Sequence, residues 1–471
     1  MSDTLLSVQM GGALLAIFSV LWIAYAIYTG RKAKDLDGFM LAGRNVGLAM
    51  GTATAMATWV TSNTIMLAPK FALQMGIWGM LAYATASFGL FLFAPMAKRI
   101  HALLPKGYTS GDFIRLRYGK PTWILYLAIT LVYSITWLVS MGMAGGIVLE
   151  ALSGLDYRIG MSVILAVCVV YTIFGGLYAV IGTDFIQSII ILIGAVIIGA
   201  VVLIKSDFAV LYERIDLERP MLLTIMMPVA LMSLFNNMFF GFGEVFHNNV
   251  WWSRAYAMRA SVASKAYGLS GLLWLPIPIG AGFIGLFAVG LGISIADPDM
   301  VGPLVSASIL GYAGAMVVFV VVFCSLASSI DSLLAATSDL VTEDIYKKMI
   351  NPAAAPETLR RNAVAIIIFL GALTWLFCFL RMGTLIQVLF LSGPFVASLI
   401  WPIVCGLYWE SVSVKGVNSA IIIASAVGVV IYFTIGWFVA TLASAAISFI
   451  ITIGMTKLAP EAYDWNRLQE A

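Results

Sequence analysis

Three carboxylates lie where water is scarce. Among 23 Asp and Glu, only Asp184, Glu244 and Asp331 fall well inside long apolar stretches of this 471-residue chain. An ionised carboxylate in such surroundings is costly unless it is paired or faces a water-lined cavity. We expect no Lys or Arg within these stretches to neutralise them, so the pattern favours a mobile cation as the partner. The alternative is a carboxyl that is protonated or hydrogen-bonded by neighbouring amides.

Four serines share one helical face beside Asp331. Ser325, Ser328, Ser329 and Ser332 are spaced i, i+3, i+4 and i+7, which places their hydroxyls on one stripe. Small residues also let membrane helices pack closely, and this is the alternative interpretation of the stripe. The adjacent carboxylate favours a site for a hard cation, because Na⁺, like Ca²⁺, prefers oxygen ligands.

Two segments carry residues that form helices poorly. The run Ala57–Thr64 is rich in hydroxyl, amide and β-branched side chains, and Pro69 follows it. We therefore expect a local break there; the alternative is an intact helix whose Ser and Thr bond back to their own carbonyls. A second interruption is expected over Asn236–Asn237 and Gly241–Glu244. Broken helices expose backbone groups to which an ion and a solute can bind.

The elements that must position these residues are membrane-spanning helices. The chain is 62% apolar or aromatic and only 10% charged, against about 25% charged in soluble domains, which excludes a soluble globular protein. Apolar blocks of roughly 18 to 27 residues recur along it, each long enough to cross about 30 Å of hydrocarbon. Blocks such as Ile189–Ile204 are continuously apolar rather than alternating, which excludes a β-barrel. We predict an all-α polytopic membrane protein.

We predict thirteen spans, with a tight turn at the glycine pair Gly175–Gly176. In the span that this glycine pair opens, Gln187 either orients Asp184 or makes a hydrogen bond between helices. Most of the 26 Lys and Arg, Arg254 among them, are expected in loops on one side, so the N-terminus is expected outside and the C-terminus in the cytoplasm. The first block lacks signal-peptide features and is expected to be retained. The predicted spans are 5–29, 47–70, 76–98, 122–150, 159–174, 177–204, 222–247, 266–294, 304–337, 362–380, 384–409, 416–436 and 438–456.

The remaining reactive residue types give no sign of catalysis. The four cysteines lie inside apolar blocks without paired spacing, which predicts apolar filler rather than disulfides or a metal site. His101 and His247 form no nucleophile or metal pattern, so we do not expect an enzyme. The net charge of +3 is a small remainder, and we expect no nucleic-acid partner.

Several separated motifs resemble the sodium/solute symporter family, which includes sodium-coupled proline, glucose, sialic acid, iodide and urea transporters. The resemblance implies a five-plus-five inverted repeat with two broken helices. Its boundaries here would be 1–46 for an additional N-terminal span and inside loop, 47–204 and 205–409 for the two five-helix repeats, and 410–471 for two C-terminal spans and a short cytoplasmic tail. The motifs are Phe39–Arg44, Thr109–Phe113, Gly175–Val180 with Thr183, Asp184 and Gln187, and Thr342–Tyr346.

The resemblance also implies ion sites. Matched by motif, one sodium ion would be held by carbonyl and hydroxyl oxygens of Ala57, Val60, Ser325, Ser328 and Ser329. Some relatives hold a second cation, whose matching positions are Asp184, Asp331 and Ser332. Relatives usually carry a hydroxyl where this chain has Asp331. The second site is therefore more acidic, and a sodium ion, a proton or a cationic group of the solute could each bind there.

The family's solute pocket lies between the broken helices and two further helices. Strings from Asn248 to Arg254 and up to Pro278 look most like the urea and polyamine branch. Trp59 and Trp137 could alternatively be packing aromatics. The matching pocket positions are Trp59, Thr61, Trp137, Gly241, Glu244, Asn248 and Gln387.

The resemblance and the acidic residues together predict a sodium-coupled symporter of the cell membrane or bacterial inner membrane. Its solute would be urea or an amine first and a zwitterionic amino acid second, with H⁺ as an alternative coupling ion. We expect a small-molecule solute and the lipid bilayer as its partners. Two alternatives stay open: a solute sensor that retains the transporter fold, and an uncoupled channel.

Overall fold

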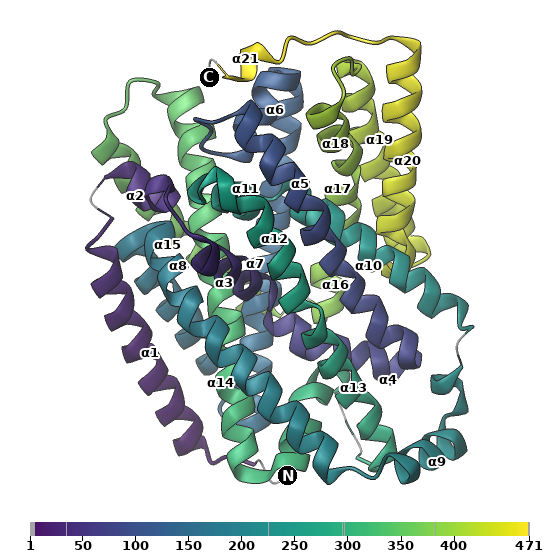
Figure 1. Ribbon diagram of the computed structural model, residues 1–471. Helices are drawn as coiled ribbons and strands as arrows, with labels where there is room; N and C mark the ends of the chain where they lie inside the picture. Colours follow the sequence, from purple (N-terminus) through teal and green to yellow (C-terminus); the bar gives the residue numbers. More distant parts are fainter. Residues whose placement is uncertain are drawn as a thin grey trace.

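The computed structural model describes residues 5–33, 35–224, 226–293, 295, 297–381 and 383–469. Within them the chain is almost entirely helical, and the β-pairing is limited to two isolated bridges, Val46 with Met258 and Ser411 with Ala462. Among these residues, eleven helical segments are long and apolar enough to cross a membrane. The two ends of the chain lie at opposite ends of the bundle (Figure 1), as an odd number of crossings requires.

The helices follow one another with short connections. The two short segments η4 (Pro298–Met300) and η5 (Val341–Ile350) flank α14. The α-helices are α1 (Val8–Gly30), α2 (Leu36–Leu41), α3 (Leu48–Trp59), α4 (Ser62–Ala84), α5 (Phe88–Leu103), α6 (Ser110–Tyr118), α7 (Lys120–Ser153), α8 (Tyr157–Lys205), α9 (Phe208–Glu218), α10 (Pro228–His247), α11 (Asn249–Ala257), α12 (Ala260–Trp274), α13 (Pro276–Gly290), α14 (Val301–Leu340), α15 (Pro356–Leu380), α16 (Leu385–Phe390), α17 (Gly393–Ser398), α18 (Ile400–Tyr408), α19 (Val414–Thr434), α20 (Trp437–Leu458) and α21 (Asn466–Gln469).

Three of the long segments are each interrupted at a glycine: α4 at Gly76, α8 at Gly176 and α14 at Gly311. The 49 residues of α8 would extend about 74 Å as one helix, more than twice the hydrocarbon thickness. Gly176 has a φ of +52° inside α8, and Gly76 has a φ of +65° inside α4. At both positions a Cβ would collide with a backbone carbonyl, of Phe39 and Leu222 respectively. Gly76 and Gly176 divide their segments as predicted, so the described helices accommodate the thirteen expected crossings.

The first predicted break is confirmed. Helix α3 ends at Trp59, and α4 begins at Ser62. Val60 between them has φ −80° and ψ 86°, outside the helical region. Thr61 then caps α4, because its hydroxyl accepts the Thr64 N–H while the Thr64 hydroxyl accepts the Thr61 N–H, a reciprocal capping box. Hydroxyl residues therefore start a new helix here instead of bonding back within the old one.

The second break exists, but its predicted position is wrong. Helix α10 runs without interruption through Asn236 and Glu244, and the break falls at Asn248, whose side chain caps α11. The glycine in the predicted stretch, Gly241, serves helix packing instead, since a Cβ there would lie 2.6 Å from the Ala86 carbonyl oxygen. The Asn236 side chain accepts the backbone N–H of Thr441.

Helix α14 lies at the centre of the bundle. It packs against α8, α7, α4 and α3, while α10 packs against α4, α5 and α20. Helix α1 lies against α8 at one edge, and the pair α19–α20 lies at the opposite edge against α17. Both broken helices therefore contact α14, and α4 and α10 also pack against each other. The two breaks lie in the interior, where polar side chains are shielded from lipid.

Candidate functional site

The serine stripe of α14 faces the carbonyl groups left free where α3 ends. The Ser328 hydroxyl donates to the Ala57 carbonyl oxygen at 2.9 Å, and the Ser329 hydroxyl donates to that of Thr58 at 3.0 Å. Both hydroxyls also lie 3.0 Å from the Ser325 carbonyl oxygen. The structure thus brings Ala57, Ser325, Ser328 and Ser329 together.

The oxygen set at this junction fits a sodium ion. It consists of carbonyl and hydroxyl oxygens without a competing side-chain cation, which is the donor type that hard cations prefer. The carbonyls at the C-terminal end of α3 also carry the negative end of the helix dipole. Ser325 offers its carbonyl rather than its hydroxyl, because the hydroxyl donates to Val321 at 2.7 Å. Val60, the remaining predicted ligand, is buried at the break itself.

Asp184 has a fixed cationic partner, which contradicts the expectation that no internal Lys or Arg would neutralise it. Arg254, on α11, is fully buried, and its Nη2 lies 3.2 Å from Asp184 Oδ2. The same Nη2 donates to the Ser332 hydroxyl at 2.5 Å, and Nε donates to Thr54 Oγ1 at 3.0 Å. The sequence predicted a cytoplasmic loop for Arg254, because the residues around it are too polar to be recognised as a membrane-spanning segment. Helix α11 instead folds into the interior as the inner half of the second broken helix.

Asp331 remains without such a partner. It is fully buried, and one of its oxygens lies 3.4 Å from the Thr183 hydroxyl. Its other oxygen, Oδ1, has no hydrogen-bond partner among the described residues. Ser332, next to it, is held by Arg254 and lies 3.0 Å from the Thr58 hydroxyl. The two aspartates are therefore in different electrostatic situations: Asp184 is paired, and Asp331 is not.

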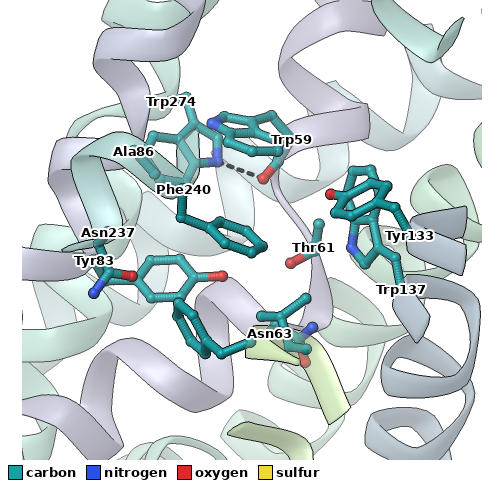
Figure 2. Close-up of a pocket in the computed structure, with 12 residues that line it drawn as sticks. Trp59, Thr61, Asn63, Tyr83, Ala86, Tyr133, Trp137, Asn237, Phe240 and Trp274 are labelled. Carbon is teal, nitrogen blue, oxygen red and sulfur yellow. Dashed lines mark hydrogen bonds between the residues drawn. The ribbon is translucent and has the colours of Figure 1, made fainter. Parts of the chain in front are cut away.

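A small cavity lies beside the break between α3 and α4. Figure 2 shows Thr61 between Phe240 on one side and Tyr133 with Trp137 on the other. Trp59 forms an edge-to-face contact with Trp137, with ring centroids 6.0 Å apart, and its carbonyl accepts the Trp274 indole N–H at 2.6 Å. The lining residues are Trp59, Thr61, Asn63, Tyr83, Ala86, Tyr133, Trp137, Asn237, Phe240, Trp274, Leu389 and Phe390.

The cavity lining contains buried polar atoms without a hydrogen-bond partner among the described residues. Asn63 Oδ1, Trp59 Nε1 and the Tyr133 hydroxyl make no hydrogen bond to the described residues. The Asn63 amide nitrogen is oriented by the Ser140 hydroxyl at 2.8 Å, so its oxygen is fixed in direction. Such atoms are rare in buried positions unless a ligand or water satisfies them. None of the lining residues is charged.

Three of the seven predicted pocket residues, Trp59, Thr61 and Trp137, line this cavity. The lining residues that sequence reasoning missed include Asn63, Tyr133 and Trp274. Asn63 had a signal, since it is the amide within the broken segment. Tyr133 had none, because it comes from the middle of an ordinary apolar helix.

The other four predicted pocket residues lie elsewhere. Glu244 sits one layer behind the wall, where both its oxygens accept the Trp251 indole N–H at 3.0 and 3.1 Å. Asn248 donates to Glu244 at 3.3 Å. Gly241 faces α5 and the turn before it, and Gln387 is an exposed residue of a capping box at the start of α16. Trp251 packs edge-on against Trp59, with ring centroids 5.3 Å apart. Glu244 therefore contacts Trp251, which in turn contacts the cavity residue Trp59.

Two of the sequence motifs, Thr109–Phe113 and Thr342–Tyr346, meet in the structure. Thr109 Oγ1 donates to Asp344 Oδ2 at 2.6 Å, and Lys348 donates to both Asp344 and Asp112. Burial opposes ionisation of Asp112, but the Lys348 ammonium and the backbone N–H groups of Tyr108 and Thr109 hold its pKa below the ordinary value. This pairing is therefore present above the ordinary pKa of an aspartate and is lost as the pH falls through the lowered one. The motifs thus tie α6 to the segment after α14.

Comparison with known proteins gives consistent matches. The model of the sodium:solute symporter family matches residues 39–424. The chain is 26% identical over 526 residues to the urea-proton symporter DUR3 of Oryza sativa subsp. japonica, a match that covers 98% of this chain and 71% of that protein. It is 25% identical over 436 residues to the osmoregulated proline transporter OpuE of Bacillus subtilis (strain 168), covering 90% and 88%. Its fold is similar to that of a Na⁺-coupled sialic acid symporter solved in a substrate-bound outward-open state, with a TM-score of 0.79, 16% identity, and coverage of 96% and 98%.

Proposed function

The chain belongs to the sodium:solute symporter family, and from this premise we propose that it couples the inward movement of Na⁺ to the uptake of a small neutral amide, with urea as the first candidate. Proteins of this family are transporters, so the cavity is a solute site rather than a catalytic one. The choice of solute rests on the polar atoms of the uncharged cavity that have no hydrogen-bond partner among the described residues.

Those atoms match an amide in kind. Urea has N–H donors and one carbonyl acceptor. Asn63 Oδ1 can accept an N–H, Trp59 Nε1 can donate to the carbonyl, and the Tyr133 hydroxyl can do either. An ion buried here would have no opposite charge in the cavity wall, which disfavours strongly charged solutes. The relative named a urea-proton symporter supports the same solute class.

A zwitterionic amino acid fits the cavity less well. A half-helix N-terminus can bind a carboxylate through its free backbone N–H groups. At the start of α4, however, the Thr64 N–H is already taken by the Thr61 hydroxyl in the capping box. The proline transporter among the relatives makes proline the natural comparison solute.

Sodium would act by joining the broken helix to α14. Ala57 and Thr58 belong to the last turn of α3, and Ser328 and Ser329 belong to α14. An ion bound between them stabilises any state in which these elements are close, and this differential affinity is what couples ion binding to a conformational change. We propose a multi-pass cell-membrane location with the N-terminus outside, which the excess of Lys and Arg in the opposite loops supports.

The direct test is uptake of radiolabelled urea into proteoliposomes under an inward Na⁺ gradient and, separately, an inward proton gradient, with proline as the comparison solute. We expect accumulation of urea that requires Na⁺. Accumulation of proline instead would move the solute class to amino acids, and accumulation driven by the proton gradient alone would reject sodium as the coupling ion. Sodium-dependent urea binding without accumulation would support the sensor alternative.

The Glu244→Gln variant is expected to raise the KM for urea by about twofold to tenfold without changing the sodium affinity. The Glu244 carboxylate accepts the Trp251 indole N–H with both oxygens, and Trp251 packs on Trp59. A glutamine is uncharged and offers only one acceptor oxygen, so the hydrogen bond is weakened by about 0.5–1.5 kcal/mol. Sodium titration of uptake beside urea titration measures both quantities. A selective loss of sodium affinity would place Glu244 in the ion site instead.

A further inference from the structure

We infer that Arg254 is a built-in cation that occupies the position of a second sodium ion, so that the protein binds one sodium ion per chain. The inference rests on the proposed sodium coupling. It contradicts the second metal site that the family resemblance implied at Asp184, Asp331 and Ser332, because a guanidinium already fills that position.

Three of the oxygens that would surround a second ion are engaged by Arg254, whereas Oδ1 of Asp184 and Oδ1 of Asp331 make no hydrogen bond to the described residues. Arg254 donates to Asp184 Oδ2 at 3.2 Å and to the Ser332 hydroxyl at 2.5 Å through Nη2, and to Thr54 Oγ1 at 3.0 Å through Nε. Thr54 in turn donates to the same Asp184 oxygen at 2.5 Å. A sodium ion at this position would have to displace the guanidinium, since both are cations that compete for the same oxygens.

The guanidinium is held in place by its buried ion pair. Arg254 and Asp184 are both fully buried, and separating a buried ion pair leaves two uncompensated charges in a low-dielectric interior. Its remaining nitrogen, Nη1, donates to the Val250 carbonyl within α11 at 3.2 Å. The cation is therefore part of the protein and does not travel with the solute.

Charge balance agrees with one mobile cation. Arg254 compensates Asp184, whereas the described residues include no Lys or Arg within ion-pairing distance of Asp331. Asp331 lies on the same helix as Ser328 and Ser329, the proposed sodium ligands. A single sodium ion bound there supplies the positive charge that the unpaired carboxylate lacks.

Arg254 also links the two halves of the site. Thr58 connects them, because its hydroxyl lies 3.0 Å from Ser332 and its carbonyl accepts the Ser329 hydroxyl at 3.0 Å. A guanidinium on α11 thus holds α3, α8 and α14 at once, through Thr54, Asp184 and Ser332 respectively. Arg254 is a positioning residue for the sodium ligands as well as a substitute for an ion.

Equilibrium binding of ²²Na⁺ to the purified full-length protein tests the inference without transport. The expected count is one sodium ion per chain for the wild type and for Arg254→Lys, which keeps the fixed charge. Arg254→Gln frees the oxygens around Asp184, so its count is expected to rise to about two. The double variant Asp184→Asn with Arg254→Gln removes both charges of the pair and is expected to return to one, which separates loss of charge from misfolding.

Two sodium ions bound to the wild type would overturn the inference, and so would a count of one in a folded Arg254→Gln. If Arg254→Gln does not fold, the counts for the wild type and Arg254→Lys still decide. Uptake in proteoliposomes separates this failure from failure of the proposed function. Two bound ions with sodium-driven urea uptake would leave the function standing, whereas no bound sodium and no sodium-driven uptake would reject both.

Discussion

Replacing Ser328 or Ser329 by alanine raises the sodium concentration required for half-maximal urea uptake by about tenfold to a hundredfold. Each hydroxyl joins α14 to a carbonyl at the end of α3, at 2.9 and 3.0 Å, and each offers a lone pair to an ion at that junction. Removing one oxygen from a charged partner costs about 1.5–3 kcal/mol, which corresponds to this range. The measurement is a sodium titration of uptake, with ²²Na⁺ binding on the same preparations.

Ser338→Ala is the matched control. Ser338 lies on the same helix and is equally buried. Its hydroxyl donates a hydrogen bond to the Ala335 carbonyl of its own helix at 2.8 Å. Its replacement should leave the sodium requirement unchanged. An unaltered sodium affinity in both Ser328→Ala and Ser329→Ala, with normal protein yield, would reject the junction of α3 and α14 as the sodium site.

Asn63→Ala is expected to raise the KM for urea by about tenfold or more. The substitution removes a fixed acceptor from the cavity wall, and an unsatisfied solute N–H in a dry site costs about 1–3 kcal/mol. Because Asn63 lies outside the sodium ligands, ²²Na⁺ binding in the absence of solute should stay at the wild-type level. Concentration dependence of urea uptake at saturating sodium measures the effect.

Ser140→Ala provides a graded comparison for Asn63. It removes only the hydroxyl that orients the Asn63 amide at 2.8 Å, so the amide remains but can rotate. We expect a KM between those of the wild type and Asn63→Ala. A wild-type KM in Asn63→Ala would contradict the assignment of this cavity as the solute site, whatever the result for Ser140.

Sequence reasoning succeeded wherever the determinant is local. The apolar blocks are long enough to cross a bilayer, and this alone fixes an all-helical membrane protein. Gly176 marks a turn because its positive φ is a backbone conformation that glycine adopts without strain. The break before Thr61 follows from a capping box formed by residues three apart. The stripe of Ser325, Ser328 and Ser329 follows from helical periodicity.

Tertiary structure decided what depends on distant residues. Asn236 was expected to break a helix. Its side chain instead accepts the backbone N–H of Thr441, 205 positions away in the sequence, and the break lies at Asn248. Arg254, expected in a loop, is drawn inside by Asp184, which is 70 positions away. Hydropathy describes each segment by its own composition and treats a charge as a marker of the surface. A buried ion pair overturns that assumption, because each charge is stable inside only when the fold supplies the other.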